Sequence, residues 1–179
     1  KMEQMGGRMQ VIVKQFPSGQ LTMPMLLGYM DNLEVTERFI PDLVLLDYPD
    51  LMKINIDNPR MSIDEIYKDF RGVMVARNMA GAVVSQSHRA AAKAKQVGAE
   101  NVAEDYSKIA NADTILTMSQ TSAEQKLGLA RLHVAAGRND QDQITIVISQ
   151  QYGLGNFIVD SNMMLGNYWQ QLPQDQEET

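Results

Sequence analysis

The segment 42–47 (DLVLLD) places the tightest constraint on the fold, because four consecutive aliphatic residues stand between two carboxylates. A strand that is apolar on both faces has to be buried on both faces, as in a parallel sheet that helices cover. Asp47 would then stand at the carboxyl end of this strand, where open α/β sheets bind their ligands. The segment therefore predicts a central parallel strand with a candidate site at its tip.

Strand and helix patterns alternate through the first two thirds of the chain. Thr22 is a candidate N-cap, and Ser62 with Glu65 has the spacing of a capping box. The expected strands are 9–16, 42–47, 81–86 and 113–120, and the expected helices are 21–33, 62–79 and the short segment 103–112. Such alternation predicts a parallel sheet with helices on its faces.

The apolar period changes to two from residue 127. Segments 127–138 and 143–153 alternate apolar and polar residues around a reversal at Asn139 and Asp140, and 155–161 reads as a last strand. We therefore expect one α/β domain over residues 1–162, with a mostly parallel sheet and an antiparallel edge. The polar, acidic tail 163–179 is expected to be disordered.

Composition indicates a soluble intracellular protein. Of the 179 residues, 44% are hydrophobic and 21% charged, which is ordinary for a globular domain. The net charge of −6 argues against a broad basic face for nucleic acid, although a local basic loop would suffice for phosphate contacts. The absence of cysteine excludes disulfides and thiolate metal sites. No apolar run is long enough to span a membrane.

Three polar clusters follow predicted strands, at residues 47–50, 85–89 and 137–140. In a parallel sheet such clusters meet at one edge, which makes this edge the predicted site. A carboxylate after a buried strand is typical of a nucleotide site that holds Mg²⁺. The phosphate-binding loop of such a site has the pattern G-x-x-x-x-G-K-[ST], yet no Lys in the chain is followed by Ser or Thr.

Five segments, taken in order, resemble the C-terminal half of the RecA-like motor domain of DnaB-type replicative helicases, most closely the phage branch. They are VKQFPSGQLT, PDLVLLDYPDLM, VVSQSHR, NADTILTMSQT and VAAGRND…ITIVISQQYG, and they cover about residues 9–161. The resemblance implies a partial RecA-like domain of the P-loop NTPase type. It also implies that the P-loop and the catalytic Glu precede the first residue, Lys1.

The resemblance implies a role for three residues at the nucleotide. Asp47 would be the Walker B carboxylate that holds Mg²⁺, a hard ion that prefers oxygen ligands. Gln86 would sense the γ-phosphate of ATP. Arg138 would be an arginine finger that enters the neighbouring subunit's site. Without the resemblance, Asp47 could equally be a turn carboxylate, Gln86 a polar strand end and Arg138 a solvated hairpin tip.

The resemblance further implies a DNA-binding loop and a set of partners. Arg89, Lys93, Lys95 and Tyr106 would lie on a loop that touches single-stranded DNA in a central channel. The lysines could instead form a solvated helix face. The implied partners are other copies of the chain in a hexameric ring, and a primase or helicase loader. The implied location is the cytoplasm, that of the host for a phage protein.

Two departures and two alternatives accompany this interpretation. Many family members carry a Lys two residues before the finger Arg, where this chain has Ala136. Without its P-loop the isolated chain is expected to be inactive. One alternative is an inert subunit or adaptor with a RecA-like fold that has lost its P-loop. The other is a RecA-like ATPase of the recombinase or circadian-clock kind.

Overall fold

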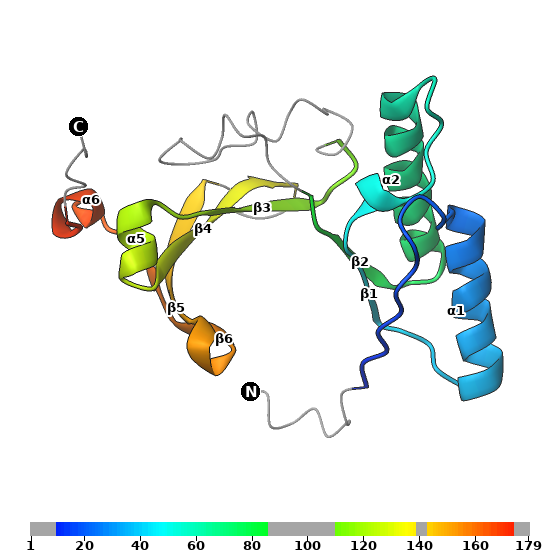
Figure 1. The fold of residues 1–179 in the computed structure, drawn as a ribbon, viewed down its shortest axis with the longest axis horizontal. Coiled ribbons are helices and arrows are strands. Elements are labelled where there is room, and N and C mark those ends of the chain that lie inside the picture. Colours follow the sequence, from blue (N-terminus) through cyan, green and yellow to red (C-terminus); the bar gives the residue numbers. More distant parts are fainter. Residues whose placement is uncertain (1–9, 86–109, 139–142, 174–179) are drawn as a thin grey trace.

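The structure, a computed structural model, describes residues 10–85, 110–138 and 143–173. In these residues two helices cover a parallel strand pair, and an antiparallel sheet extends away from them (Figure 1). The elements in chain order are α1 (Met23–Glu37), β1 (Leu43–Leu46), η2 (Pro49–Leu51), α2 (Pro59–Ala76), β2 (Ala80–Val83), β3 (Thr114–Ser119), α5 (Ser122–Lys126), β4 (Leu129–Gly137), β5 (Ile144–Gln151), η5 (Tyr152–Leu154), β6 (Asn156–Met163) and α6 (Tyr168–Gln171).

The helical core follows the apolar periodicity of the sequence. Helix α1 begins at the predicted N-cap, where the Met25 N–H donates to Thr22 Oγ1 at 3.3 Å. Helix α2 buries Ile66, Tyr67, Phe70 and Met74, which lie on one face at helical spacing. Phe70 and Met74 join the buried residues of α1 and of β1 in a single apolar cluster. The two helices thereby cover one side of the parallel pair.

Two local predictions at the start of the chain and of α2 are wrong. Residues 10–16 form no strand, so the structure does not support the part of 9–16 that it describes. Helix α2 begins at Pro59 with Asn58 as its N-cap, and Ser62 lies inside the helix with its N–H bonded to the Asn58 carbonyl. Pro59 starts the helix because proline is preorganised for the first helical position.

Strands β1 and β2 pair in parallel, with Leu43 opposite Ala80 and Leu46 opposite Val83. Gly81 lets this pair lie close to α2: a Cβ there would stand 2.7 Å from Phe70 Cε1 and 2.8 Å from Met74 Cγ. The close approach requires glycine, because real Cβ atoms do not come this near to other heavy atoms. The parallel pair predicted from its apolar run is therefore present and locked against the helix.

The remaining strands form a second sheet in the order β3-β4-β5-β6, antiparallel throughout. This confirms the hairpins expected from the period of two. Strand β3 pairs with β4, and among the described strands it has no hydrogen-bonded partnership with β1 or β2. The described strands thus make two sheets where the sequence analysis expected one. Periodicity indicates that a segment is a strand, but it does not identify its neighbours.

A buried ion pair holds the far end of the second sheet. Glu124 and Arg131 are almost completely buried, and Arg131 donates from Nε to Glu124 Oε1 at 2.6 Å and from Nη2 to Oε2 at 3.1 Å. Glu124 also closes a capping box with Thr121 at the start of α5. The Tyr168 hydroxyl donates to Glu124 Oε1 at 2.6 Å. One carboxylate therefore ties α5, β4 and α6 together.

The expected disordered tail does not begin at residue 163. Tyr168 and Trp169 lie in α6, Tyr168 is buried, and the Arg131 guanidinium lies 4.6 Å from the centre of the Trp169 ring. The polar composition of this segment masked two aromatic anchors, whose burial and cation–π contact offset the cost of ordering them. Residues 174–179 lie outside the described residues.

Replacing Glu124 with Gln should lower the free energy of unfolding by about 3 kcal/mol, because it leaves the Arg131 charge buried without a counter-charge. Urea denaturation of the wild type and the variant measures the difference. A matched control is Asp31→Asn, which removes the partner of Arg77 from an exposed ion pair and should change stability little.

The same pair gives a signature in pH. Burial would raise the pKa of Glu124, but hydrogen bonds from Arg131, Tyr168 and Thr121 outweigh it and lower the pKa below its usual value. The charged carboxylate thus contributes stability at neutral pH that is lost as the pH falls through its folded pKa. The gap between the wild type and Glu124→Gln should narrow in acid, and a gap independent of pH would contradict the assignment.

Candidate functional site

The tips of β1 and β2 form the first part of the candidate site. Asp47 directly follows β1 and Ser85 lies two residues beyond β2. The Val84 N–H donates to the Leu46 carbonyl at 3.1 Å, which continues the parallel pairing to the end of both strands. Asp47 and Ser85 are therefore at neighbouring strand ends, as the sequence predicted for the first two polar clusters.

Asp47 presents a carboxylate to solvent. Its side chain is exposed, and within the described part of the chain it has no hydrogen bond or ion pair. The peptide bond to Tyr48 is cis, and the chain then enters η2, where the Leu51 N–H donates to the Tyr48 carbonyl. An exposed carboxylate oxygen fits Mg²⁺, which proteins often hold with one or two carboxylates beside the phosphates of a nucleotide.

A complete metal cage is not present in residues 10–85, 110–138 and 143–173, where no three His, Cys, Asp or Glu side chains come together. Asp47 could accordingly supply one ligand, and other ligands would have to come from the nucleotide, water or another segment. This matches the donor set that a Walker B carboxylate provides, and it does not match a structural metal site.

Arg138 belongs to a second cluster, at the junction of β4, β3 and α2. The Arg138 N–H donates to the Asp113 carbonyl at 2.9 Å. Its guanidinium donates from Nη2 to the Ala110 carbonyl at 2.6 Å, and Nη1 lies 3.6 Å from Asp113 Oδ1. Arg71 of α2 donates to the same Oδ1 at 2.8 Å and to the Asn111 carbonyl at 2.8 Å.

Electrostatics in this second cluster favour the charged forms. The hydrogen bond from Arg71 is the main cause that lowers the pKa of Asp113, and the charges of Arg71 and Arg138 add to it. The same hydrogen bond raises the pKa of Arg71. Two guanidinium groups share one carboxylate, so the cluster carries a net positive charge.

The predicted meeting of three polar clusters at one edge is correct for two of them. The third cluster, which begins at Gly137, follows β4, and β4 runs antiparallel to β3 with Gly137 opposite Thr114. The carboxyl end of β4 therefore lies beside the amino end of β3. The argument from parallel strands does not apply to Arg138, because its strand belongs to a hairpin.

Five of the predicted site residues lie outside the described residues: Gln86, Arg89, Lys93, Lys95 and Tyr106. Two residues that the sequence analysis did not single out, Arg71 and Asp113, contact Arg138 or its neighbours directly. Their separation in the chain is 42 residues, and no local pattern signals a pair so far apart. Only the packing of α2 against the segment before β3 identifies them.

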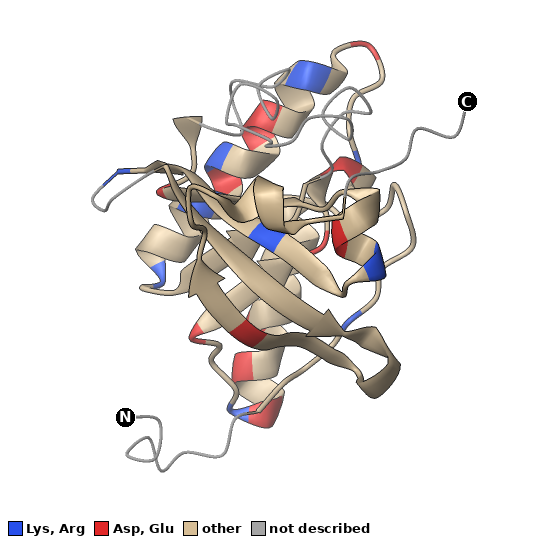
Figure 2. Ribbon diagram, turned by 90° about the vertical axis from the view of Figure 1, so that its left-hand side faces the viewer, with Lys and Arg blue, Asp and Glu red and all other residues tan. Residues whose placement is uncertain are grey.

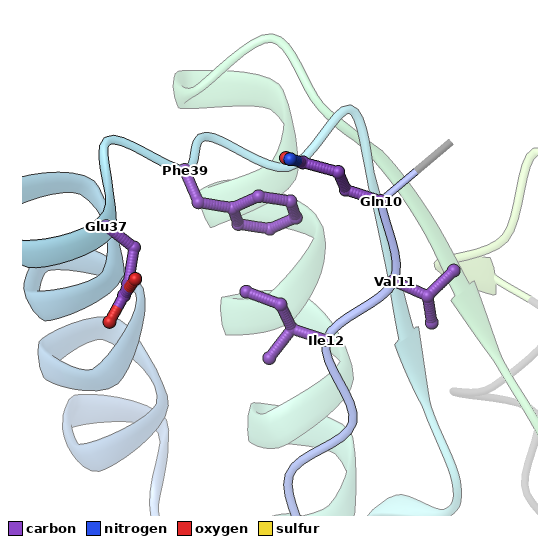
Figure 3. A pocket seen from close by; sticks show the side chains of 5 residues that line it. All are labelled: Gln10, Val11, Ile12, Glu37 and Phe39. Carbon is purple, nitrogen blue, oxygen red and sulfur yellow. The ribbon is translucent and has the colours of Figure 1, made fainter. Parts of the chain in front are cut away.

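The described surface has one further feature near its start, a cavity of about 330 Å³ between the segment 10–12 and the end of α1 (Figure 3). Gln10, Val11, Ile12, Glu37 and Phe39 line it, and none of them is a predicted site residue. The cavity combines three apolar side chains with one carboxylate and one amide. It contributes nothing to the chemistry expected at Asp47 or Arg138.

Charge is mixed over the described elements. Figure 2 shows acidic and basic positions interspersed on the ribbon, without a broad basic face in this view. This agrees with the expectation that any contact with nucleic acid would be local. Among the described residues no helix has the length and apolar character needed to cross a membrane.

Comparisons with known proteins give matches in structure and none in sequence. No protein-family model matches the chain, and no curated protein matches it. A solved structure of the ATPase domain of a DnaB-like helicase aligns with a TM-score of 0.63 and 14% identity, over 76% of this chain and 51% of that one. The structure of a DnaB-like replicative helicase, solved for its interactions with primase, aligns with a TM-score of 0.65 and 15% identity.

The fold is RecA-like. The second alignment covers 76% of this chain and 34% of the helicase, so this chain spans about half of one structure and a third of the other. The α/β architecture, with its parallel pair and antiparallel C-terminal strands, is thereby confirmed as that of DnaB-like helicase ATPase domains. The likeness concerns the fold, since the shared identity is low.

Asp47 alone should bind Mg²⁺ weakly, with a dissociation constant on the order of 1 mM or above, because one carboxylate replaces few of the ion's water ligands. Amide chemical shifts around residues 46–52, followed during a Mg²⁺ titration, measure this binding. Asp47→Asn should abolish the shifts, and Asp113→Asn should leave them unchanged. Micromolar binding by the isolated chain would contradict a site that needs a nucleotide for completion.

Proposed function

We propose that this chain is the later part of the motor domain of a ring-forming, ATP-driven replicative DNA helicase of the DnaB type. The observation that carries the proposal is the RecA-like fold combined with an exposed carboxylate, Asp47, at the tip of a buried parallel strand. The ring would act on single-stranded DNA in the cytoplasm, and a primase or a loader would be its protein partners. In support, the DnaB-like structural neighbour was solved for its interactions with primase.

Asp47 would hold the Mg²⁺ that accompanies ATP, and Gln86 would contact the γ-phosphate. Mg²⁺ neutralises charge that builds on the phosphoryl group during transfer. The exposure of Asp47 and its position beside the end of β2 support this role, since a nucleotide could approach both strand tips from solvent. The P-loop that cradles the phosphates would come from a segment outside this sequence.

Arg138 would complete the nucleotide site of a neighbouring subunit. Within its own chain it contacts Ala110 and Asp113, and among the described residues it has no bond to the tip of β1. A cation that is half-exposed and not bound to its own candidate site is suited to act on another subunit. Such arginines accelerate hydrolysis by about 10³-fold or more.

The uncovered faces of both sheets support the proposal that further strands and helices belong to this domain. Large apolar side chains on β1 and β3 are exposed, among them Leu43, Leu45, Leu116 and Met118. Strands that are apolar on both faces are normally covered on both faces. The rest of the motor domain would cover these residues in the parent protein.

Arg138→Ala should abolish DNA-stimulated ATP hydrolysis by the full-length protein while nucleotide binding remains. Asp47→Asn should also be inactive. If Arg138 acts between subunits, mixing the two variants should restore activity, to about one quarter of wild type at equal amounts, because some interfaces then combine an intact Asp47 with an intact Arg138. Steady-state ATPase assays over a series of mixing ratios measure the recovery.

Retained hydrolysis in Arg138→Ala alone would contradict the finger role. Activity that stays absent at every mixing ratio, although fluorescence shows that subunits exchange, would contradict its action between subunits. A mixture of Arg138→Ala with Asp31→Asn, which leaves both functional residues intact in one partner, is the matched positive control.

The isolated chain should show no ATP hydrolysis and should self-associate. Hydrolysis requires the phosphate cradle, and the exposed apolar residues of β1 and β3 favour association. A phosphate-release assay and light scattering over a concentration series measure the two properties. Turnover of ATP by the purified chain, or a strictly monomeric chain at high concentration, would contradict the corresponding part of the proposal.

A further inference from the structure

The junction of α2, β3 and β4 contains an arrangement that goes beyond the family resemblance: one carboxylate, Asp113, lies between two arginines. Its Oδ1 accepts a hydrogen bond from Arg71 Nη2 at 2.8 Å and lies 3.6 Å from Arg138 Nη1. The two contacts differ in kind, since the first is a charge-assisted hydrogen bond and the second is an ion pair too long for one. Asp113 is therefore bound firmly to Arg71 and loosely to Arg138.

Arg71 anchors the segment that receives Arg138. Its guanidinium donates to the Asp113 side chain and to the Asn111 carbonyl, both at 2.8 Å, so one rigid fork fixes two points of residues 111–113 on α2. Arg71 is itself held by α2, whose apolar face is packed into the core. The position of the Asp113 carboxylate is thus set by a helix and not by a free loop.

Arg138 is placed against this anchored segment at three points. Its N–H bonds to the Asp113 carbonyl, its Nη2 bonds to the Ala110 carbonyl, and its Nη1 faces the Asp113 carboxylate. The side chain still remains 51% exposed. A long arginine side chain at a hairpin end would otherwise sample many rotamers, and these contacts reduce that freedom while leaving the charge accessible to an anion.

We propose that Asp113 and Arg71 are positioning residues for Arg138, which aim its guanidinium at the nucleotide phosphates of a neighbouring subunit. The inference rests on the proposed function of Arg138. The two-to-one ratio of arginine to carboxylate leaves one positive charge uncompensated, and the weaker hold on Arg138 selects it as the charge that is presented. Arg71 acts through Asp113 and would not touch the nucleotide.

The test compares variants of the full-length protein in DNA-stimulated ATP hydrolysis. Asp113→Asn should lower kcat by about 10-fold to 100-fold, as expected for a displaced catalytic group, with a change in the KM for ATP of less than about threefold. Asp113→Glu, which restores the charge, should recover part of kcat. Asp31→Asn is the matched control, because the Asp31–Arg77 pair has exposed fractions of 59% and 27% and the Asp113–Arg71 pair has 63% and 32%.

Epistasis with Arg138 separates positioning from a general loss of structure. In the Arg138→Ala background, Asp113→Asn should have no further effect on the residual rate, since its action passes through the arginine. The proposal is overturned if Asp113→Asn behaves like Asp31→Asn while Arg138→Ala is inactive, or if its loss adds to that of Arg138→Ala. If Arg138→Ala itself retains full hydrolysis, the proposed finger fails first and the positioning role falls with it.

Discussion

The parallel pairing of β1 with β2, pressed against α2, is the constraint on which the candidate site depends. Gly81 allows β2 to approach Phe70 and Met74, and the register then carries both strands to a common end. Asp47 is displayed at that end because the four aliphatic residues before it are committed to the strand. A side chain at Gly81 would push β2 from α2 and move the strand tip on which the carboxylate stands.

Two ion-pair arrangements in the same chain illustrate different uses of arginine. Glu124 and Arg131 are buried, Glu124 is satisfied further by Thr121 and Tyr168, and together they join three elements into one unit. The arginines at Asp113 are partly exposed and outnumber the carboxylate. The first arrangement suits stability, because its charges are balanced. The second suits the recognition of an anion, because one charge remains available.

The sequence predicted what local periodicity and capping can encode. It identified the Thr22 cap, the buried face of α2, the strand before Asp47 and the hairpins of β4 and β5, with boundaries shifted by a few residues. It placed a capping box at Ser62, where Asn58 and Pro59 start the helix, and it overlooked the real box at Thr121 and Glu124. Both boxes have the same spacing, and only the surrounding packing distinguishes them.

Tertiary neighbours were beyond the reach of the sequence. No pattern links Arg71, Asp113 and Arg138, and none separates β3 from the parallel pair or fixes α6 on Glu124. The family resemblance supplied a role for Arg138 and for Asp47, and the structure supplied their surroundings. The fold was thus largely predictable, whereas the cluster around Arg138 could be found only in three dimensions.

The most direct test of the central claim is the sequence of the source gene upstream of the codon for Lys1. A motor domain requires a phosphate-binding loop of the form G-x-x-x-x-G-K-[ST] and a later strand that ends in Glu, within roughly two hundred preceding codons. Finding both in frame is the result that our account predicts. A start codon immediately before Lys1, with neither motif encoded, would contradict it and would favour an inert RecA-like subunit or adaptor.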